Sequence, residues 1–249
     1  MKPYYADESV TLYHGDCREI LPDLEGGVSM ALVDPPYGET SLLWDQWIPE
    51  LPGLVGRLTN SMWCFGSLRM FLAHVDDFAG WRMSQDVVWE KHNGSSFHAD
   101  RFKRVHEIAA HWYRGPWSEI YRQPQVTMDS TRRSVRRRER PAHTGEIADS
   151  TYTSEDGGPR LARSVIYCRS MHGRALHPTE KPAGILDPLI AYGCPPGGTV
   201  LDPTAGSGAS LAVAKATGRH AIGIETDERH CETAARRLAQ ETLFQESPA

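Results

Sequence analysis

Short apolar runs that end in an acid or a glycine alternate with stretches of helical spacing along most of the chain. The runs at 10–16 (VTLYHGD) and 28–34 (VSMALVD) predict strands, and the near-continuous apolar character of the second is typical of a strand buried on both faces. Between them, 17–24 (CREILPDL) has the apolar spacing of a helix. Further strands are predicted at 61–66, 85–91 and 107–114, and a helix at 70–80.

The C-terminal part of the chain, from residue 181 onward, carries the clearest pattern. It begins with a predicted helix and a Pro-Gly turn, and a strand at 199–202 then leads into a second helix that ends near Gly218. Another strand at 220–227 precedes an amphipathic helix that starts at 228. This βαβα unit requires parallel strands, so we predict an α/β fold with an open, mostly parallel sheet.

Two strands do not complete such a sheet, and the chain ends soon after them. The N-terminal strands can supply the missing neighbours if the order of the elements is circularly permuted. Acids follow or end four of these strands: Asp16, Asp34, Asp202 and Glu225. We therefore expect all four at the carboxyl edge of one sheet, where ligands bind in folds of this class.

The middle of the chain differs from both ends. Residues from about 115 to 165 show little periodicity and many Arg, Ser, Thr, Gly and Asp, which indicates an inserted, partly mobile region between two parts of one domain, 1–114 and 166–249. Residues 101–140 carry eleven Lys and Arg against four Asp and Glu, a net charge of +7. Because the net charge of the whole chain is −5, the rest of the chain carries −12. This asymmetry predicts a polyanionic partner, and a solvated arginine-rich loop is the alternative.

Composition narrows the class of protein. Hydrophobic content of 40% and charged content of 24% are ordinary for a globular protein. No apolar run approaches the ~20 residues of a membrane span, and the N-terminus lacks the apolar region of a secretory signal. The five cysteines form no CxxC pair and the histidines have no metal-ligand spacing, so we predict reduced thiols, no disulfide framework and no metal site.

The loop at 202–208 (DPTAGSG) predicts a nucleoside-binding site. Its small residues let backbone N–H groups approach a ligand at the start of a helix. Glu225, at the end of the next strand, can accept both hydroxyls of a ribose. No lysine follows the glycines, which excludes a Walker loop, and Asp202 suits a cofactor with a cationic end, such as S-adenosylmethionine, better than a pyrophosphate. A dinucleotide and an ordinary βα turn remain the alternatives.

Three motifs together resemble the amino-methylating DNA methyltransferases: DPPY at 34–37, HPTEKP at 177–182 and DPTAGSG at 202–208. The order, with DPPY before the cofactor loop, is similar to the β group of that family. Segments 87–94 and 101–114 are also similar to the family, and the resemblance covers about residues 10–114 and 164–240. It implies a circularly permuted, Rossmann-like, S-adenosylmethionine-dependent methyltransferase fold, in which 115–165 is an inserted target-recognition region.

The resemblance also implies roles for individual residues. Asp16 is expected to contact the cofactor's adenine, with a helix N-cap as the alternative, and His177, Thr179 and Lys181 are expected beside its methionine end, with a helix-initiating loop as the alternative. By this resemblance, the expected catalytic residues are Asp34, Pro35, Pro36 and Tyr37. The cofactor-binding residues are Asp16, Cys17, Asp34, His177, Thr179, Lys181, Asp202, Thr204, Ala205, Gly206, Ser207, Gly208, Glu225 and Thr226. Apart from the resemblance, the basic middle of the chain is expected to contact phosphates, and balancing the acidic remainder is the alternative for some of its arginines. The candidates are Arg132, Arg133, Arg136, Arg137, Arg138 and Arg140.

The DPPY corner suits methylation of an exocyclic amine. Such an amine is a poor nucleophile because its lone pair is delocalised into the base. Asp34 and the Pro35 carbonyl can each accept one of its N–H groups, and Tyr37 offers a stacking face worth about 1–3 kcal/mol. A paired base must first flip out of the helix to reach this corner. Glu107, which begins a predicted strand, is expected to be structural.

Several functional alternatives stay open. In the family, an acid before Pro-Pro-Tyr usually goes with adenine N6, which favours adenine here over cytosine N4. Two hypotheses lie outside the class of DNA methyltransferases: a nicotinamide-dependent oxidoreductase and a non-catalytic DNA-binding module. The expected partner is double-stranded DNA, a homodimer and a restriction endonuclease are open, and the expected location is the cytoplasm, at the nucleoid.

Overall fold

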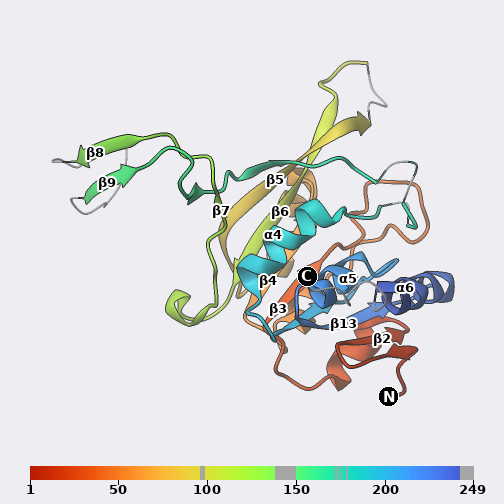
Figure 1. The fold of residues 1–249 in the computed structure, drawn as a ribbon. Coiled ribbons are helices and arrows are strands. Elements are labelled where there is room, and N and C mark those ends of the chain that lie inside the picture. The colour runs from red at the N-terminus through yellow and green to blue at the C-terminus, as the bar shows by residue number, and fades with distance from the viewer. Residues whose placement is uncertain (96–98, 138–149, 172, 174, 178, 242–249) are drawn as a thin grey trace. The chain divides into compact units, whose positions relative to one another are not determined.

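The computed structural model describes residues 1–95, 99–137, 150–171, 173, 175–177 and 179–241, and divides the chain into two units (Figure 1). The first unit comprises Met1–Gln123 and Ser164–Ala249, and the second is Pro124–Arg163. Each unit is described by itself below. The predicted boundaries at 114 and 166 stay a prediction.

Nine of the described strands in the first unit form one sheet. Its order is β1 (Tyr5–Ala6), β2 (Val10–His14), β13 (His220–Glu225), β12 (Thr199–Asp202), β3 (Met30–Val33), β4 (Ser61–Gly66), β6 (Arg104–Tyr113), β5 (Arg82–Ser95) and β11 (Val165–Tyr167). The five strands from β2 to β4 are parallel, β6 runs antiparallel to β4 and β5, and β11 is parallel to β5. The sheet confirms the predicted permutation, because C-terminal strands β13 and β12 lie between N-terminal strands β2 and β3.

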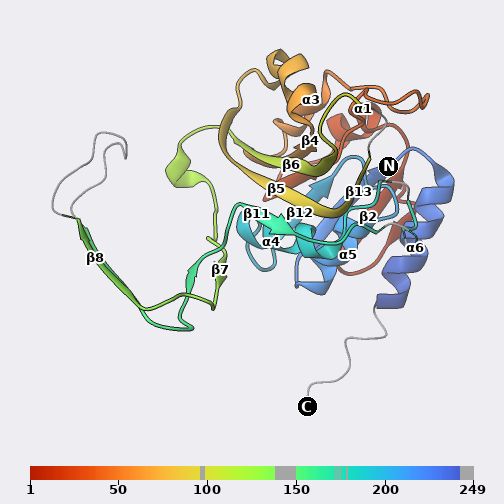
Figure 2. The same cartoon turned by 90° about the horizontal axis from the view of Figure 1, so that it is seen from above.

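Helices cover both faces of this sheet, as Figure 2 shows. One face carries α4 (Ala183–Gly193), α5 (Ala209–Ala216) and α6 (Glu228–Glu241). The other carries α1 (Cys17–Ile20), α2 (Leu51–Val55) and α3 (Leu68–Ala73), with 3₁₀ turns at Leu21–Asp23 and Val75–Phe78; a third such turn is Trp117–Glu119.

Strand β3 shows how the apolar pattern produces this layering. All four of its residues are buried. Because successive side chains point to opposite faces, Met30 and Leu32 join the apolar cluster beneath α4 and α5, while Ala31 and Val33 join the cluster on the α1 and α2 side. A strand with this pattern belongs at the centre of a two-sided sheet, and its C-terminal end lies at the carboxyl edge of the parallel strands.

The second unit contains strands that the sequence pattern did not predict. Strand β7 (Val126–Thr127) pairs antiparallel with β10 (Arg160–Leu161), and β8 (Arg133–Arg137) pairs with β9 (Ser150–Ser154). Asp129 and Arg160 form an ion pair at 2.8 Å beside the first ribbon. Periodicity does not predict these strands, because β7 and β10 have two residues each and β8 and β9 are mostly polar.

Three further properties concern the part of the chain that the structure describes. None of the helices in the described ranges combines the length and the apolar character needed to cross a bilayer. All five cysteines are free thiols. Within the same ranges, no three His, Cys, Asp or Glu side chains are grouped so that they could hold a metal ion.

Candidate active site

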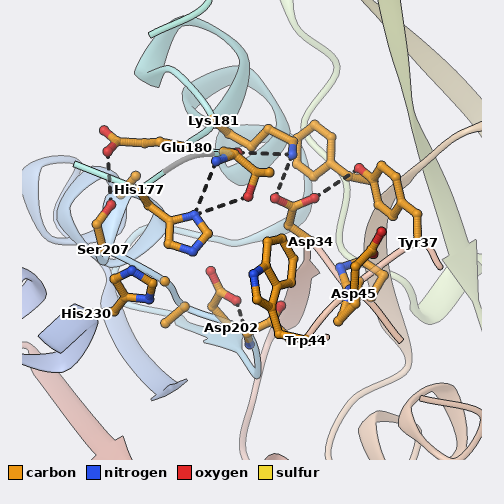
Figure 3. Close-up of a pocket in the computed structure, with 18 of the residues that line it drawn as sticks. Asp34, Tyr37, Trp44, Asp45, His177, Glu180, Lys181, Asp202, Ser207 and His230 are labelled. Carbon is orange, nitrogen blue, oxygen red and sulfur yellow. Dashed lines mark hydrogen bonds and ion pairs between the residues drawn. The ribbon is translucent and has the colours of Figure 1, made fainter. Parts of the chain in front are cut away.

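A cavity of about 1470 Å³ opens at the carboxyl edge of the sheet in the first unit (Figure 3). It is lined by both ends of the chain, which meet there through strands β2, β3, β12 and β13. The lining includes all four residues of the DPPY corner. It also includes every predicted cofactor residue except Gly208, which precedes α5 with φ +73°. A Cβ at Gly208 would lie 2.8 Å from the Cβ of Ala234, so glycine permits close packing of α5 against α6.

Asp34 directly follows β3 and is held on both carboxylate oxygens. The Tyr37 hydroxyl lies 3.0 Å from Oδ1 and donates to it, and the Lys181 ammonium lies 2.6 Å from Oδ2. Burial first, and then the charges of Asp34 and Glu107, raise the pKa of Tyr37 well above its usual value, so its hydroxyl stays protonated. The sequence placed Lys181 beside the cofactor; the structure brings its ammonium to Asp34.

Glu107 joins this cluster from β6. Its Oε2 lies 3.3 Å from the Lys181 ammonium and 3.4 Å from the Tyr37 hydroxyl, and its Oε1 pairs with Lys91 of β5. Burial favours a protonated Glu107, but the two lysines outweigh it and lower the pKa to about 2. Sequence reasoning gave Glu107 a structural role, because nothing in its strand shows that Lys181, 74 positions away, packs against it.

Asp202 ends β12, the strand paired with β3, and anchors the small-residue loop. Its Oδ1 accepts the Thr204 N–H at 3.0 Å and its Oδ2 accepts the Ser210 hydroxyl of α5. The side chain is buried, and burial raises its pKa to about 7 against the lowering effect of these two hydrogen bonds. The nearby charges of Asp34 and Glu225 add to the rise.

The buried carboxyl of Asp202 predicts a pH dependence of stability. Its pKa in the folded protein exceeds that of the unfolded chain, so the unfolded chain loses this proton first as the pH rises. The Asp202 contribution to the free energy of unfolding therefore falls between about pH 4 and pH 7, by on the order of a few kcal/mol, and is level above that. In Asp202→Asn the amide oxygen can accept the Thr204 N–H and the amide NH2 can donate to the Ser210 hydroxyl. We expect the melting temperature of this variant to rise relative to that of the wild type as the pH is raised from 5 to 8.

Thermal unfolding followed by circular dichroism at each pH measures this difference, with the exposed Asp187→Asn of α4 as the matched control. Parallel curves for the wild type and Asp202→Asn over the whole range would show that Asp202 does not titrate as described.

Glu225 ends β13 and ties down the same loop. Its Oε2 accepts the Gly206 N–H at 2.8 Å, and its Oε1 accepts the Asp227 N–H at 2.8 Å. Thr226 follows it on the cavity wall. The ring of His177 approaches this region and lies perpendicular to that of His230, with centroids 4.4 Å apart. Burial, followed by the charge of His230, lowers the pKa of His177, so this ring is neutral near pH 7.

The HPTEKP segment is fixed to the loop by a residue that sequence reasoning did not single out. Glu180 accepts the Ser207 hydroxyl at 2.9 Å and pairs with Arg237 of α6 at 2.7 Å, and Arg237 also donates to the Ser207 carbonyl. Within the segment, the Thr179 N–H donates to His177 Nδ1. Glu180 belongs to the HPTEKP motif, so the sequence could have indicated that it is part of the site. His230 and Lys91 belong to no motif, and nothing in the sequence indicated that they lie in the site.

Asp16 and Cys17 line the cavity beside β2. Asp16 caps α1, since its carboxylate accepts the Arg18 N–H at 2.8 Å, and its pKa is lowered by its hydrogen bonds with the Arg18 side chain. The N-cap alternative is therefore realised, and contact with a cofactor stays a prediction. Cys17 is buried, and burial raises the pKa of its thiol to about 11.

A short loop after the DPPY corner covers part of the cavity. The Asp45 carboxylate accepts three backbone N–H groups, from Gly38 at 2.9 Å, Glu39 at 3.1 Å and Thr40 at 2.7 Å. Trp44 is half exposed, lines the cavity and lies 6.3 Å from His177 between ring centroids. The loop is thus organised by Asp45, and it places the half-exposed Trp44 ring on the cavity wall.

The predicted phosphate-contacting arginines lie in the second unit. Arg132 and Arg133 are exposed at the start of β8. Arg136 and Arg137 belong to the same strand by their backbone, and their side chains lie outside what the structure describes. Arg138 and Arg140 lie outside the described residues altogether.

Comparisons with known proteins agree with this geometry. A family model described as DNA methylase (N6_N4_Mtase) matches residues 28–236. The chain is 25% identical to type II methyltransferase M.HinfI of Haemophilus influenzae, over 96% of this chain and 71% of that protein. It is 24% identical to type II methyltransferase M.ScaI of Streptomyces caespitosus, over 96% and 84%.

Two solved structures share the fold. The complex of M1.HpyAVI with SAM is 22% identical, with a TM-score of 0.64 over 92% of this chain and 99% of that one. The cytosine-N4-specific PvuII DNA methyltransferase is 14% identical, with a TM-score of 0.66 over 100% and 91%. These likenesses confirm the predicted Rossmann-like methyltransferase fold.

Proposed function

The chain belongs to this DNA methylase family, and on that premise we propose that it methylates the exocyclic N6 of adenine in a base flipped out of double-stranded DNA. The observation that carries the proposal is the shared cavity, in which the DPPY corner from one end of the chain faces the small-residue loop from the other. We assign S-adenosyl-L-methionine as the methyl donor, in keeping with the family and with a structural neighbour that was solved as a SAM complex.

The residues of the cavity fit this donor. The Thr204 hydroxyl is buried and has no hydrogen-bond partner within the described structure, which leaves a polar atom for a ligand to satisfy. Asp202 and Glu225 give this side of the cavity an acidic character that suits a cationic cofactor and not a pyrophosphate. Asp16, the 202–208 loop and Glu225 would hold it, and when bound it supplies a methyl group activated by attachment to a sulfonium.

The DPPY corner can activate the target amine without forming a covalent bond to it. A carboxylate has about four lone-pair sites, so Asp34 can still accept an N–H while Tyr37 and Lys181 occupy two of them. The Pro35 carbonyl can accept the second N–H. Together these acceptors draw the nitrogen lone pair out of conjugation, and the two prolines keep them rigid. Tyr37 packs beside Asp34 and offers a ring to the flipped base.

Adenine is proposed over cytosine because an acid, Asp34, stands before Pro-Pro-Tyr. Cytosine N4 presents the same N–H pattern to the corner and is the second candidate. DNA from cells that express the protein, in a host without other DNA methylation, distinguishes them: we expect N6-methyladenine in nucleoside mass spectrometry and a single sequence context in modification-sensitive sequencing. N4-methylcytosine in place of N6-methyladenine would contradict the adenine assignment, and no methylated nucleoside would contradict enzymatic function.

Two alternatives lie outside the class of DNA methyltransferases. A nicotinamide-dependent oxidoreductase leaves the DPPY corner without a role, and the family match sets it aside. A non-catalytic DNA-binding module predicts DNA binding without methyl transfer, which the same assay detects. Two partners remain predictions, a second copy of the chain and a restriction endonuclease. A location at the nucleoid is also a prediction, which follows from action on DNA.

The exposed arginines of the second unit are proposed to contact phosphates. We expect the double variant Arg132→Ala/Arg133→Ala to lower the slope of log affinity against log salt by about 2, because each phosphate contact contributes about 0.9. Fluorescence anisotropy with a labelled duplex measures the slope. Arg57→Ala/Arg69→Ala, which removes two exposed arginines of the first unit, is the control. An unchanged slope in the first variant would remove Arg132 and Arg133 from the interface.

A further inference from the structure

Lys181 is a buried cation placed against the proposed catalytic acid. It is 7% exposed, and its ammonium lies 2.6 Å from Asp34 Oδ2 and 3.3 Å from Glu107 Oε2. The ammonium also lies over the ring of Phe65, 5.1 Å from its centroid. Figure 3 shows its ammonium at one carboxylate oxygen of Asp34 and the Tyr37 hydroxyl at the other. The two oxygens of Asp34 are therefore fixed by two different side chains.

Burying an ammonium costs several kcal/mol unless counter-charges and hydrogen bonds compensate it. Here two carboxylates do so, and burial alone would lower the pKa of Lys181, but Asp34 and Glu107 outweigh it and raise that pKa. Glu107 is in turn paired with Lys91. The result is a chain of alternating charges, Lys91, Glu107, Lys181 and Asp34, that runs from β5 through β6 to the end of β3 with no net charge.

We propose that Lys181 is a positioning residue for methyl transfer, which Glu107 holds in place and which aims the Asp34 carboxylate at the target amine. This inference rests on the proposed function and concerns the same cavity. A carboxylate whose two oxygens are both held needs no reorientation when the amine arrives. Small errors in the position of a catalytic group lower the reaction rate steeply. The backbone supports the arrangement, because Lys181 lies just before α4 and Asp34 just after a central strand.

The first test replaces Lys181 with methionine, which keeps the length of the side chain and removes its charge. We expect Lys181→Met to lower kcat about 10- to 100-fold, while the Kd for S-adenosylmethionine, measured by calorimetry, stays within about threefold. The matched control is Lys215→Met, because Lys215 also forms a buried ion pair, at 2.6 Å from Asp7, outside the cavity lining. The control should lose stability and keep its kcat.

A double variant separates positioning from simple charge compensation. The variant Lys181→Met/Glu107→Gln removes the Lys181 ammonium together with the carboxylate that it faces at position 107. If Lys181 serves Asp34, kcat stays low in the double variant. If Lys181 merely neutralises Glu107, kcat returns to the wild-type value, and the proposal is overturned.

The pH profile of Glu107→Gln gives an independent readout. The titratable groups that face Lys181 are Asp34 and Tyr37 after β3, Cys64 of β4, Glu107 of β6 and His177 of its own segment. Loss of one of the two carboxylates lowers the pKa of Lys181, so kcat should begin to fall at a lower alkaline pH than in the wild type. A decrease by the same factor at every pH would show a merely structural Glu107 and would contradict the proposal.

The proposed function and the positioning role of Lys181 are contradicted by different results. A wild-type protein that transfers no methyl group to DNA defeats the proposed function itself. A fully active Lys181→Met, or one whose cofactor Kd weakens as much as its kcat falls, overturns the positioning role alone and leaves the methyltransferase in place.

Discussion

Asp34→Ala is expected to reduce methyl transfer about 10³-fold or more, while the Kd for S-adenosylmethionine changes by less than about threefold. The carboxylate is the acceptor nearest to the proposed path of the amine, and its loss also leaves Tyr37 and Lys181 without the group that they orient. Cofactor binding should survive because the 202–208 loop is held by Asp202, Glu225 and Glu180. Single-turnover transfer of a labelled methyl group and calorimetry measure the two quantities.

The matched control for this prediction is Asp23→Ala, which removes an exposed acid from the 3₁₀ turn after α1. It should transfer methyl groups at the wild-type rate. Equal loss of transfer and of cofactor binding in Asp34→Ala would mean that Asp34 maintains the fold of the cavity and is not the acceptor.

Glu225→Ala is expected to weaken cofactor binding about 100-fold and to leave kcat at saturating cofactor within a few-fold of the wild type. The Glu225 carboxylate accepts the Gly206 N–H of the loop and the Asp227 N–H after β13. Each such charged hydrogen bond is worth about 1.5–3 kcal/mol, and every 1.4 kcal/mol is tenfold in Kd. The ribose hydroxyls proposed to bind there lose their acceptor as well. Calorimetry with S-adenosylhomocysteine gives the affinity without turnover.

Glu232→Ala serves as the control, because Glu232 is an exposed acid on α6 that pairs with Arg236. Its cofactor Kd should equal that of the wild type. A Glu225→Ala variant that binds the cofactor normally but has lost kcat would place Glu225 on the DNA side of the cavity and contradict the assignment.

The sheet and the acids at its edge could be predicted because they depend on patterns within single strands. The apolar run before Asp34 specifies a central strand, and a βαβ unit specifies the parallel direction of β12 and β13. Once the strands are parallel, Asp202 and Glu225 must lie at the same edge. The permutation followed from the same reasoning, since the C-terminal unit alone leaves the sheet incomplete.

The charge cluster could not be predicted because it depends on tertiary packing. Glu107 opens a predicted strand, and only the pairing of β6 with β5 brings it beside Lys91, while a separate segment delivers Lys181. The resemblance placed Lys181 in a motif near the cofactor, but a motif does not say toward which wall of a cavity its side chain turns. In the second unit, strands β8 and β9 hold few apolar residues, so their pairing left no trace in the periodicity.

The shared cavity as the site of transfer is tested most directly by a crystal structure with a non-reactive S-adenosylmethionine analogue and a duplex that carries the identified target sequence. We expect the target adenine outside the helix, its ring beside Tyr37 and its N6 at hydrogen-bonding distance, about 3 Å, from the Asp34 carboxylate. The analogue should lie against the 202–208 loop and Glu225. A target base that stays stacked in the duplex, or that binds away from Asp34 while the analogue occupies the cavity, would contradict this site.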